Sequence, residues 1–183
     1  MNKLIITANP SIKAFTHTIA NKFKELSINK GDTVEILDLY RTDLKQDFLS
    51  YEVMGENPLD ETTKKIQEKI TWADELVFVF PIWWGDCPAI MKNFIDSNFL
   101  TGFAFKYENG KSVGLLKGKS ARIIATSGAP SFFYKIILHI QFFWNMNRIG
   151  FCGLKQKSFT VFGNIDRSAT DKNKYLSELE KLV

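Results

Sequence analysis

Five times along the chain, a short apolar run is followed by a longer segment of helical character. The runs predict strands at residues 3–8, 33–39, 75–81, 120–127 and 157–162. The longer segments predict helices at residues 15–28, 60–72, 88–99, 132–148 and 168–183. The run at 75–81 is apolar throughout, which is typical of a central strand that helices cover on both faces. Alternating strands and helices predict an α/β protein with a parallel sheet.

Short sequence features punctuate this pattern. Asp60 is expected to cap the helix that follows it, and Pro88 suits the first turn of the next helix. The pair Asn109-Gly110 predicts a hairpin turn. Two segments lack a clear pattern: residues 40–58, expected to be a loop, and residues 101–118, expected to be an irregular excursion around that hairpin.

Five units fit the flavodoxin-like fold, a three-layer α/β/α arrangement whose five-stranded parallel sheet has the strand order 2-1-3-4-5. We expect residues 1–183 to form one such domain, because no linker, repeat or low-complexity segment interrupts them. Ligands of doubly wound sheets bind beyond the carboxyl ends of the strands. The loops expected at that edge are residues 9–16, 81–88 and 126–134.

The composition narrows the class of protein. Hydrophobic residues make up 45% of the chain and charged residues 24%, which excludes a disordered or fibrous protein. The 16 Phe, 4 Trp and 5 Tyr exceed what the core of one domain needs. This surplus points to a flat ligand or a subunit interface, although a Phe-rich core would give the same count.

The net charge and the two cysteines limit which binding partners and which cellular compartment we expect for this protein. The net charge of +4 comes from scattered lysines, so we expect anionic ligands such as nucleotides but no nucleic-acid partner. Polar and charged residues interrupt the apolar stretch 132–151, which is therefore not expected to be embedded in a membrane. Cys87 and Cys152 match neither a disulfide framework nor a metal motif, which suits a cytoplasmic protein without a metal site.

Polar residues in the first loop predict a phosphate site. Asn9, Ser11, Lys13 and Thr16 lie between the first strand and the first helix, where free N–H groups at the helix N-terminus attract an anion. The side chains of Ser11, Lys13 and Thr16 add donors. The loop lacks the glycine-rich dinucleotide and Walker motifs, so an ordinary helix cap remains the alternative.

The second loop, F-P-I-W-W-G-D-C-P at 80–88, predicts a site for a flat heterocycle. Trp83 and Trp84 stand where a strand ends, so they cannot both point into the core. Gly85 and the flanking prolines fix a turn that can aim the two rings and the backbone at a ligand. The alternative is that core packing and a subunit interface take up these rings.

The third loop, Thr126-Ser127-Gly128-Ala129-Pro130, follows an apolar strand and has small residues that let a ligand approach the backbone. Alone, such a segment would be compatible with any turn. Together with the other two loops, it predicts one ligand site at the carboxyl edge of the sheet.

At these residues the sequence resembles the flavodoxin-like NAD(P)H:quinone oxidoreductases, the DT-diaphorase-like family with its bacterial relatives. The likeness is carried by Phe15-Thr16, by F-P-I-W-W-G-D-C-P-A-I-M-K at 80–92, by T-S-G-A-P-S-F-F-Y at 126–134 and by F-C-G at 151–153. These blocks follow the family's order over nearly the whole chain.

The resemblance implies a bound flavin, FAD or FMN, with NAD(P)H as hydride donor and a quinone-like acceptor that binds after the donor has left, in a ping-pong mechanism. It implies contacts to the flavin phosphate and ribityl chain from Phe15, Thr16 and the backbone beyond Asn9. Contacts along the isoalloxazine are implied for Pro81, Ile82, Trp83 and Trp84, and contacts at its pyrimidine end for Thr126, Ser127, Gly128, Ala129 and Tyr134.

Two side chains are candidates for a direct part in catalysis. The Tyr134 hydroxyl would donate a hydrogen bond to negative charge on the reduced flavin. The resembling enzymes place a His six residues after this Tyr, but that position is Ile140 here and His139 precedes it. His139 is therefore either a ligand contact or a core or interface residue. Other departures from the family are Asn9 for His, Ala14 for Ser and Gly85 for an aromatic residue.

The expected helix 132–148 is apolar around most of its circumference, so a peripheral position would leave apolar side chains in water. We therefore expect a two-fold homodimer that covers this helix, as in the resembling enzymes. The excursion 101–118 is the alternative cover.

Three other functions fit the same fold. An electron-carrier flavodoxin would have a Thr/Ser/Gly-rich phosphate loop and an acidic charge, and this chain has neither. A phospho-accepting receiver domain would need acidic residues after its first and third strands, where Asn9 and Pro81 stand. A regulatory subunit of a potassium-efflux transporter, as some relatives are, stays open.

Overall fold

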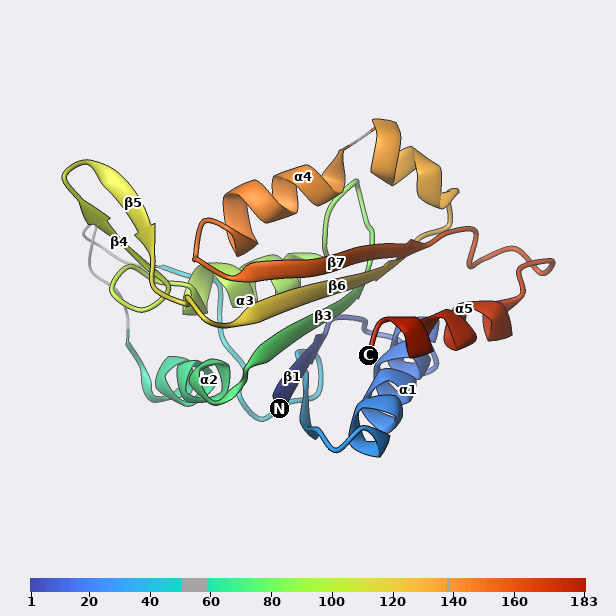
Figure 1. The fold of residues 1–183 in the computed structure, drawn as a ribbon, viewed down its shortest axis with the longest axis horizontal. Coiled ribbons are helices and arrows are strands. Elements are labelled where there is room, and N and C mark those ends of the chain that lie inside the picture. Colours follow the sequence, from blue (N-terminus) through green and yellow to red (C-terminus); the bar gives the residue numbers. More distant parts are fainter. Residues whose placement is uncertain (51–58, 138) are drawn as a thin grey trace.

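The computed structural model describes residues 1–50, 59–137 and 139–183. Its centre is a sheet of five parallel strands in the order β2-β1-β3-β6-β7 (Figure 1). The strands are β1 (Asn2–Thr7), β2 (Thr33–Asp38), β3 (Glu75–Pro81), β6 (Ser120–Thr126) and β7 (Lys155–Phe162). Numbered among themselves, they have the predicted order 2-1-3-4-5, so the flavodoxin-like arrangement is confirmed.

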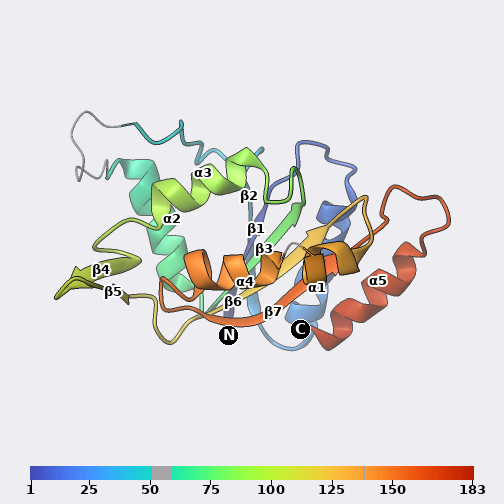
Figure 2. The ribbon, with the colours of Figure 1, turned by 90° about the horizontal axis from the view of Figure 1, so that it is seen from above.

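Helices cover both faces of the sheet and give the three predicted layers (Figures 1 and 2). One face carries α1 (Phe15–Asn29) and α5 (Lys172–Glu178), and the other carries α2 (Glu61–Trp72), α3 (Ala89–Asn98) and α4 (Ile140–Trp144). Successive side chains of a strand point to opposite faces, so Leu4 and Ile6 belong to one core and Ile5 to the other. Every residue of β3 is buried, as its apolar run predicts.

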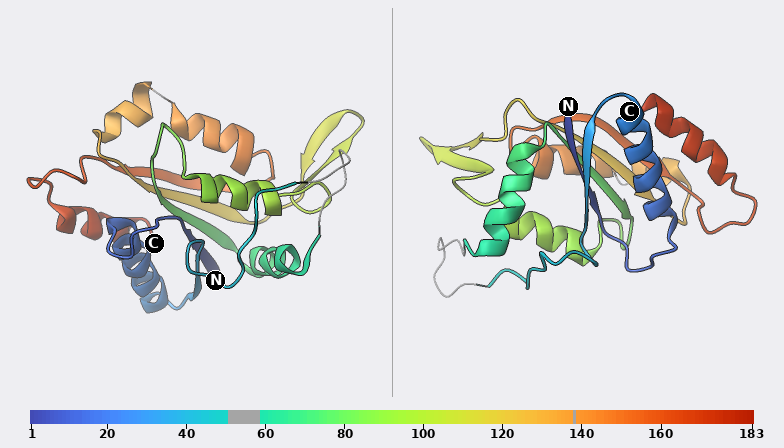
Figure 3. Two further views of the ribbon diagram at one scale, coloured as in Figure 1. Left: turned by 180° about the vertical axis from the view of Figure 1, so that it is seen from behind. Right: turned by 90° about the horizontal axis from the view of Figure 1, so that it is seen from below.

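Two short-range predictions are confirmed. The Asp60 carboxylate accepts a hydrogen bond from the Thr63 N–H at 2.6 Å and caps α2. Asn109 and Gly110, both at positive φ, form the turn of a hairpin. Its strands are β4 (Phe105–Glu108) and β5 (Lys111–Gly114). The hairpin projects from the end of the molecule opposite the β7–α5 loop (Figures 2 and 3).

The prediction of one continuous helix over 132–148 is wrong. His139 takes a left-handed conformation with φ 46° and separates α4 from the segment before it. Stretches with wide helical turns flank the short α4, at Phe133–Ile137 and Asn145–Ile149. Tertiary contacts outweigh helix propensity here, because the burial of Ile140 and Trp144 fixes α4 against the sheet. The predicted helical residue Leu138 lies outside the described residues.

The other boundaries differ less. The last helix begins at Lys172 instead of residue 168, because the Asp171 carboxylate accepts hydrogen bonds from the N–H groups of Asn173 and Lys174 and caps it there. Pro88 lies just before α3 instead of in its first turn. The last helix ends at Glu178 instead of residue 183, and one 3₁₀ turn follows it at Leu179–Lys181. The remaining bounds shift by at most two residues. Residues 51–58 of the predicted loop 40–58 lie outside the described residues. In the described parts of the chain, no helix is long and apolar enough to cross a membrane.

Candidate functional site

A cavity of about 450 Å³ opens at the carboxyl edge of the sheet, where β1, β3 and β6 end. The three predicted loops meet there and are joined by a fourth loop, which follows β7. The described residues that line this cavity are Asn9, Ser11, Lys13, Ala14, Phe15, Thr16, Pro81, Ile82, Trp83, Thr126, Ser127, Gly128, Ile165, Asp166 and Lys172. Eleven of the predicted cofactor contacts therefore share one hollow, which we call the edge cavity.

One end of the edge cavity is suited to an anion. The helix α1 begins there without a capping side chain, because its N-cap residue is Ala14, and its first turn holds no acidic residue. Lys13 and Lys172 supply positive charge at the same place. The buried Thr16 hydroxyl has no hydrogen-bond partner among the described residues. At the wall of a cavity, a buried hydroxyl in this state is free to form a hydrogen bond with a ligand atom.

A side chain outside the cavity holds the first loop in shape. Arg41 donates to the backbone oxygens of Asn9 at 3.2 Å and Pro10 at 2.6 Å. Its guanidinium also pairs with Asp38 at 2.8 Å, and His17 Nε2 lies 3.1 Å from the same Asn9 oxygen. Arg41 was not predictable as part of the site, because it stands in the segment 40–58, which has no recognisable pattern.

The second loop closes into a tight turn at the mouth of the cavity. Trp83 N–H donates to the Asp86 backbone oxygen at 2.9 Å, and Asp86 N–H donates to that of Trp83 at 3.0 Å. Trp84 and Gly85, both at positive φ, occupy its two central positions. The Trp83 ring lines the edge cavity, whereas Trp84 is fully exposed to solvent. Trp83 can therefore contact a ligand in the edge cavity, whereas Trp84 faces solvent, and neither ring is part of the core.

The third and fourth loops are bonded to each other. Ser127 N–H donates to Phe162 O at 2.9 Å, and Ile165 N–H donates to Ser127 O at 3.0 Å. These bonds bring Ile165 and Asp166 to the cavity wall beside Gly128. The Thr126 hydroxyl is buried and, like that of Thr16, is unpaired within the described chain. No sequence motif marked the fourth loop, because only its pairing with the third loop brings it to the site.

Four predicted site residues lie outside the lining of the edge cavity: Trp84, Ala129, Tyr134 and His139. Tyr134 is half-buried and packs edge-on against Phe133, with ring centroids 5.5 Å apart. His139 is exposed at the left-handed junction before α4. The catalytic parts assigned to Tyr134 and His139 stay predictions.

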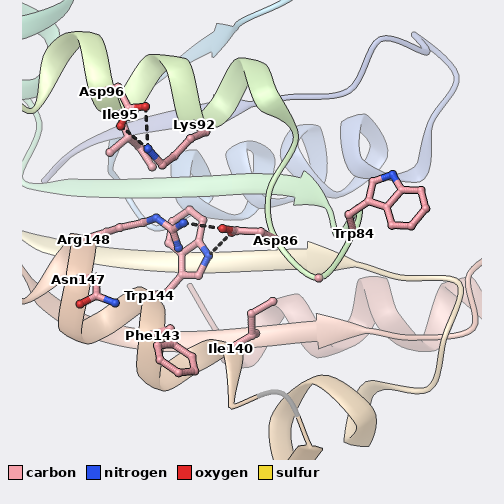
Figure 4. A pocket seen from close by; sticks show the side chains of 11 residues that line it. Trp84, Asp86, Lys92, Ile95, Asp96, Ile140, Phe143, Trp144, Asn147 and Arg148 are labelled. Carbon is pink, nitrogen blue, oxygen red and sulfur yellow. Dashed lines mark hydrogen bonds and ion pairs between the residues drawn. The ribbon is translucent and has the colours of Figure 1, made fainter.

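A second cavity, of about 530 Å³, lies between α3 and the segment 140–148 (Figure 4). Trp84 and Gly85 line it from one side, so the tight turn separates the two cavities. Asp86 also lines it, and its carboxylate accepts hydrogen bonds from Trp144 and Arg148. Sequence patterns did not predict this contact, which joins residues about 60 positions apart.

Neither thiol is suited to act as a nucleophile. Burial raises the pKa of the Cys87 thiol to about 12, and the neighbouring Asp86 carboxylate adds to this shift. Burial likewise raises the pKa of the Cys152 thiol to about 11. Among the described residues, no cluster of His, Cys, Asp and Glu could hold a metal ion.

Comparison with known proteins shows to which family the chain belongs. The sequence model of the family described as having the flavodoxin-like fold matches residues 1–183. The chain belongs to this family.

Two relatives with similar sequences are oxidoreductases by name, and a third has a solved structure. An uncharacterized NAD(P)H oxidoreductase of Haemophilus influenzae is 32% identical over 98% of this chain and 92% of its own length. An FMN-dependent NADH:quinone oxidoreductase of Clostridium beijerinckii is 30% identical over 97% of this chain and 94% of its own length. The crystal structure of Smu.1420 from Streptococcus mutans is 31% identical, covers 100% of this chain and 98% of that one, and superposes with a TM-score of 0.86.

Proposed function

We propose that this protein is a flavin-dependent oxidoreductase that takes hydride from NAD(P)H and reduces a quinone-like acceptor. The observation that carries the proposal is the pair of buried hydroxyls of Thr16 and Thr126, which have no partner among the described residues and line one cavity at the carboxyl edge of the sheet. Two of the relatives named above are NAD(P)H or NADH oxidoreductases by name, and one of these names includes quinone. The electron-carrier and transporter-subunit alternatives gain no support from those names.

The residues present fit the phosphate end of a flavin. The uncapped N-terminus of α1 offers backbone N–H groups, and Lys13 and Lys172 offset the negative charge of a phosphate. Ser11 and the unpaired Thr16 hydroxyl provide further hydrogen bonds. FMN is the expected flavin, because the Clostridium beijerinckii relative is FMN-dependent.

The residues present also fit the flat end of a flavin. Pro81, Ile82 and Trp83 give apolar lining, while Thr126 and Gly128 offer a hydroxyl and an accessible backbone in the same cavity. A bound flavin supplies the hydride chemistry, and the protein contributes position, exclusion of water and hydrogen bonds. Tyr134 is proposed to donate a hydrogen bond to negative charge on the reduced flavin, and His139, at the junction before α4, to contact flavin or substrate.

Donor and acceptor are proposed to use one opening in turn, by a ping-pong mechanism. The tight turn at Trp83–Asp86 closes one side of the edge cavity, and the third and fourth loops close the other. Two substrates that compete for the remaining opening must bind one after the other.

The protein is proposed to act as a two-fold homodimer in the cytoplasm. Apolar side chains in and around α4 are exposed: Phe132, Phe133, Ile136, Phe142, Phe143 and Met146. Such a surface is larger than single exposed apolar residues would give, and a second copy of the chain is the proposed cover. The two free, buried cysteines suit a reducing compartment.

The deciding experiment for this function is a flavin titration of the purified protein. We expect one FMN per chain, seen as quenching of flavin fluorescence, and NADH-dependent reduction of a benzoquinone by the loaded protein. Absence of binding to both FMN and FAD would exclude the proposed function.

A further inference from the structure

The local hydrogen bonds of the tight turn Trp83–Asp86 are its two backbone bonds and one from the Cys87 N–H to Asp86 Oδ1 at 2.7 Å. Trp84 stands at φ 51°, a left-handed conformation that is costly for a bulky side chain. Its indole points into solvent, away from the other cavity residues, and contributes no packing (Figure 4). A contact from elsewhere in the fold is needed to keep this turn in one conformation.

The Asp86 side chain supplies that contact. Its Oδ1 accepts from the Trp144 indole N–H at 3.0 Å, and its Oδ2 accepts from Arg148 Nη2 at 2.5 Å (Figure 4). Trp144 is fully buried and stacked on Phe80, with ring centroids 5.0 Å apart. The Arg148 guanidinium lies 4.7 Å from the centroid of the Trp144 ring, and this cation–π contact stabilises the positions of both donors. Asp86 is thus bonded to a rigid partner.

We propose that the Asp86–Arg148 pair is a latch that positions Trp83 at the edge cavity, and that opening it weakens the binding of flavin and acceptor. Trp83 lines that cavity and is bonded to Asp86 in both directions, so a shift of Asp86 moves the tryptophan. Asp86 and Arg148 do not line the edge cavity themselves and act as positioning residues. The identity of the ligand rests on the proposed function, whereas the geometry of the turn does not.

The chain offers a matched control in the same second cavity. Lys92 and Asp96 form an ion pair there with Nζ–Oδ distances of 2.5 and 2.6 Å, as short as the Asp86–Arg148 contact. Both residues belong to α3, four positions apart, and neither is bonded to the tight turn. Asp96→Asn removes a charge from the cavity without opening the latch.

The first test uses flavin-free protein. Amide hydrogen exchange of the Trp83 and Asp86 N–H groups, measured by NMR, reports the opening of the turn directly. Arg148→Met and Asp86→Asn should speed this exchange about tenfold, because a charge-assisted hydrogen bond is lost. Arg148→Lys keeps the charge and should have a smaller effect, and Asp96→Asn should have none. Unchanged exchange in Arg148→Met, or equal exchange in Asp96→Asn, would overturn the latch.

The second test uses FMN-loaded protein. Arg148→Met should raise the Kd for FMN and the KM for benzoquinone about tenfold, with kcat at saturating FMN within about twofold of the wild-type value. The double variant Asp86→Asn/Arg148→Met should be no worse than either single one, because both open the same latch. A fall in kcat with unchanged Kd and KM would contradict the proposal. If the wild-type protein binds no flavin, the proposed function fails, while the exchange measurement still decides the latch.

Discussion

The carboxylate of Asp166 lies against the backbone of Gly128, so that a Cβ built on this glycine would come within 2.6 Å of Asp166 Oδ2. Gly128→Ala must therefore displace the carboxylate, and the adjoining wall of the edge cavity changes shape. We expect FMN binding to weaken about tenfold, which corresponds to about 1.4 kcal/mol, because the displaced carboxylate changes the shape of the cavity wall. Fluorescence titration of FMN measures the effect.

The double variant Gly128→Ala/Asp166→Ala separates this clash from other causes. Because the obstructing atom is the end of a side chain, its removal makes room for the new methyl group. Affinity for FMN should return at least halfway to the value of Asp166→Ala alone. If the double variant binds as weakly as Gly128→Ala, contact with Asp166 is not the cause.

Replacement of the Thr126 hydroxyl should weaken ligand binding without lowering the stability of the flavin-free protein. Thr126→Val keeps the shape of a side chain whose buried Oγ1 has no partner in the described chain. The flavin-free protein should therefore melt at the same or a higher temperature, because a desolvated polar atom is removed. FMN affinity should fall about tenfold, since the ligand loses a hydrogen bond in a buried site.

Two other threonines serve as controls for this variant. The Thr7 hydroxyl is also buried and unpaired within the described residues but does not line the cavity, so Thr7→Val should leave FMN affinity unchanged. The Thr63 hydroxyl accepts a hydrogen bond from Gln46 at 3.0 Å, so Thr63→Val should lower the melting temperature. A melting temperature of Thr126→Val as low as that of Thr63→Val would contradict the assignment of its hydroxyl to a ligand.

Steady-state kinetics test the single opening. With NADH and a benzoquinone varied in turn, double-reciprocal plots should give parallel lines, because the donor product must leave before the acceptor binds. Intersecting lines would reveal both substrates bound at once and would rule out the shared opening.

The exposed apolar side chains around α4 predict the oligomeric state. Light scattering at micromolar concentration should give twice the chain mass of 21.0 kDa. Phe142→Glu should shift the protein to the monomer, because it places a charge in the proposed interface. Ile28→Glu changes another exposed apolar residue, on α1 at the other face, and should leave the dimer intact. A wild-type mass near 21.0 kDa would refute the dimer.

The buried thiols predict an alkaline limit to stability. Cys87 and Cys152 have pKa values of about 12 and about 11 in the folded protein, whereas an unfolded thiol ionises near pH ~8.5. The unfolded state loses these protons first, so stability falls as the pH rises above that value. Reaction with Ellman's reagent at pH 8 should be slow in the native protein and fast after unfolding. Rapid reaction of both thiols in the native state would contradict their burial.

Local patterns predicted most of the fold. The continuous apolar run at β3 and the caps and turns at Asp60 and Asn109 act over a few residues, and the structure has them where the sequence placed them. The break at His139 was not predictable in this way. It depends on how the buried Trp144 meets the sheet, which is a contact between distant segments.

The same distinction applies to the candidate site. Three of its loops were recognisable because strand ends and loop composition mark them in the sequence. Arg41, which holds the first loop, and Asp166, which faces Gly128, carry no motif and reach the site only through the folded chain. The contact between Asp86 and Arg148 is of the same kind.

Three of the four tryptophans occupy very different surroundings, and their emission can report on separate parts of the protein once Trp72, half-buried on α2, is replaced by Phe. Trp84 stands fully in water and Trp83 at the mouth of the edge cavity, while Trp144 is sealed in the core. Indole emission depends on contact with water and is quenched by a nearby acceptor of excitation energy. Events at the turn and unfolding of the core therefore have separate spectral signatures, and both can be followed without attaching a label.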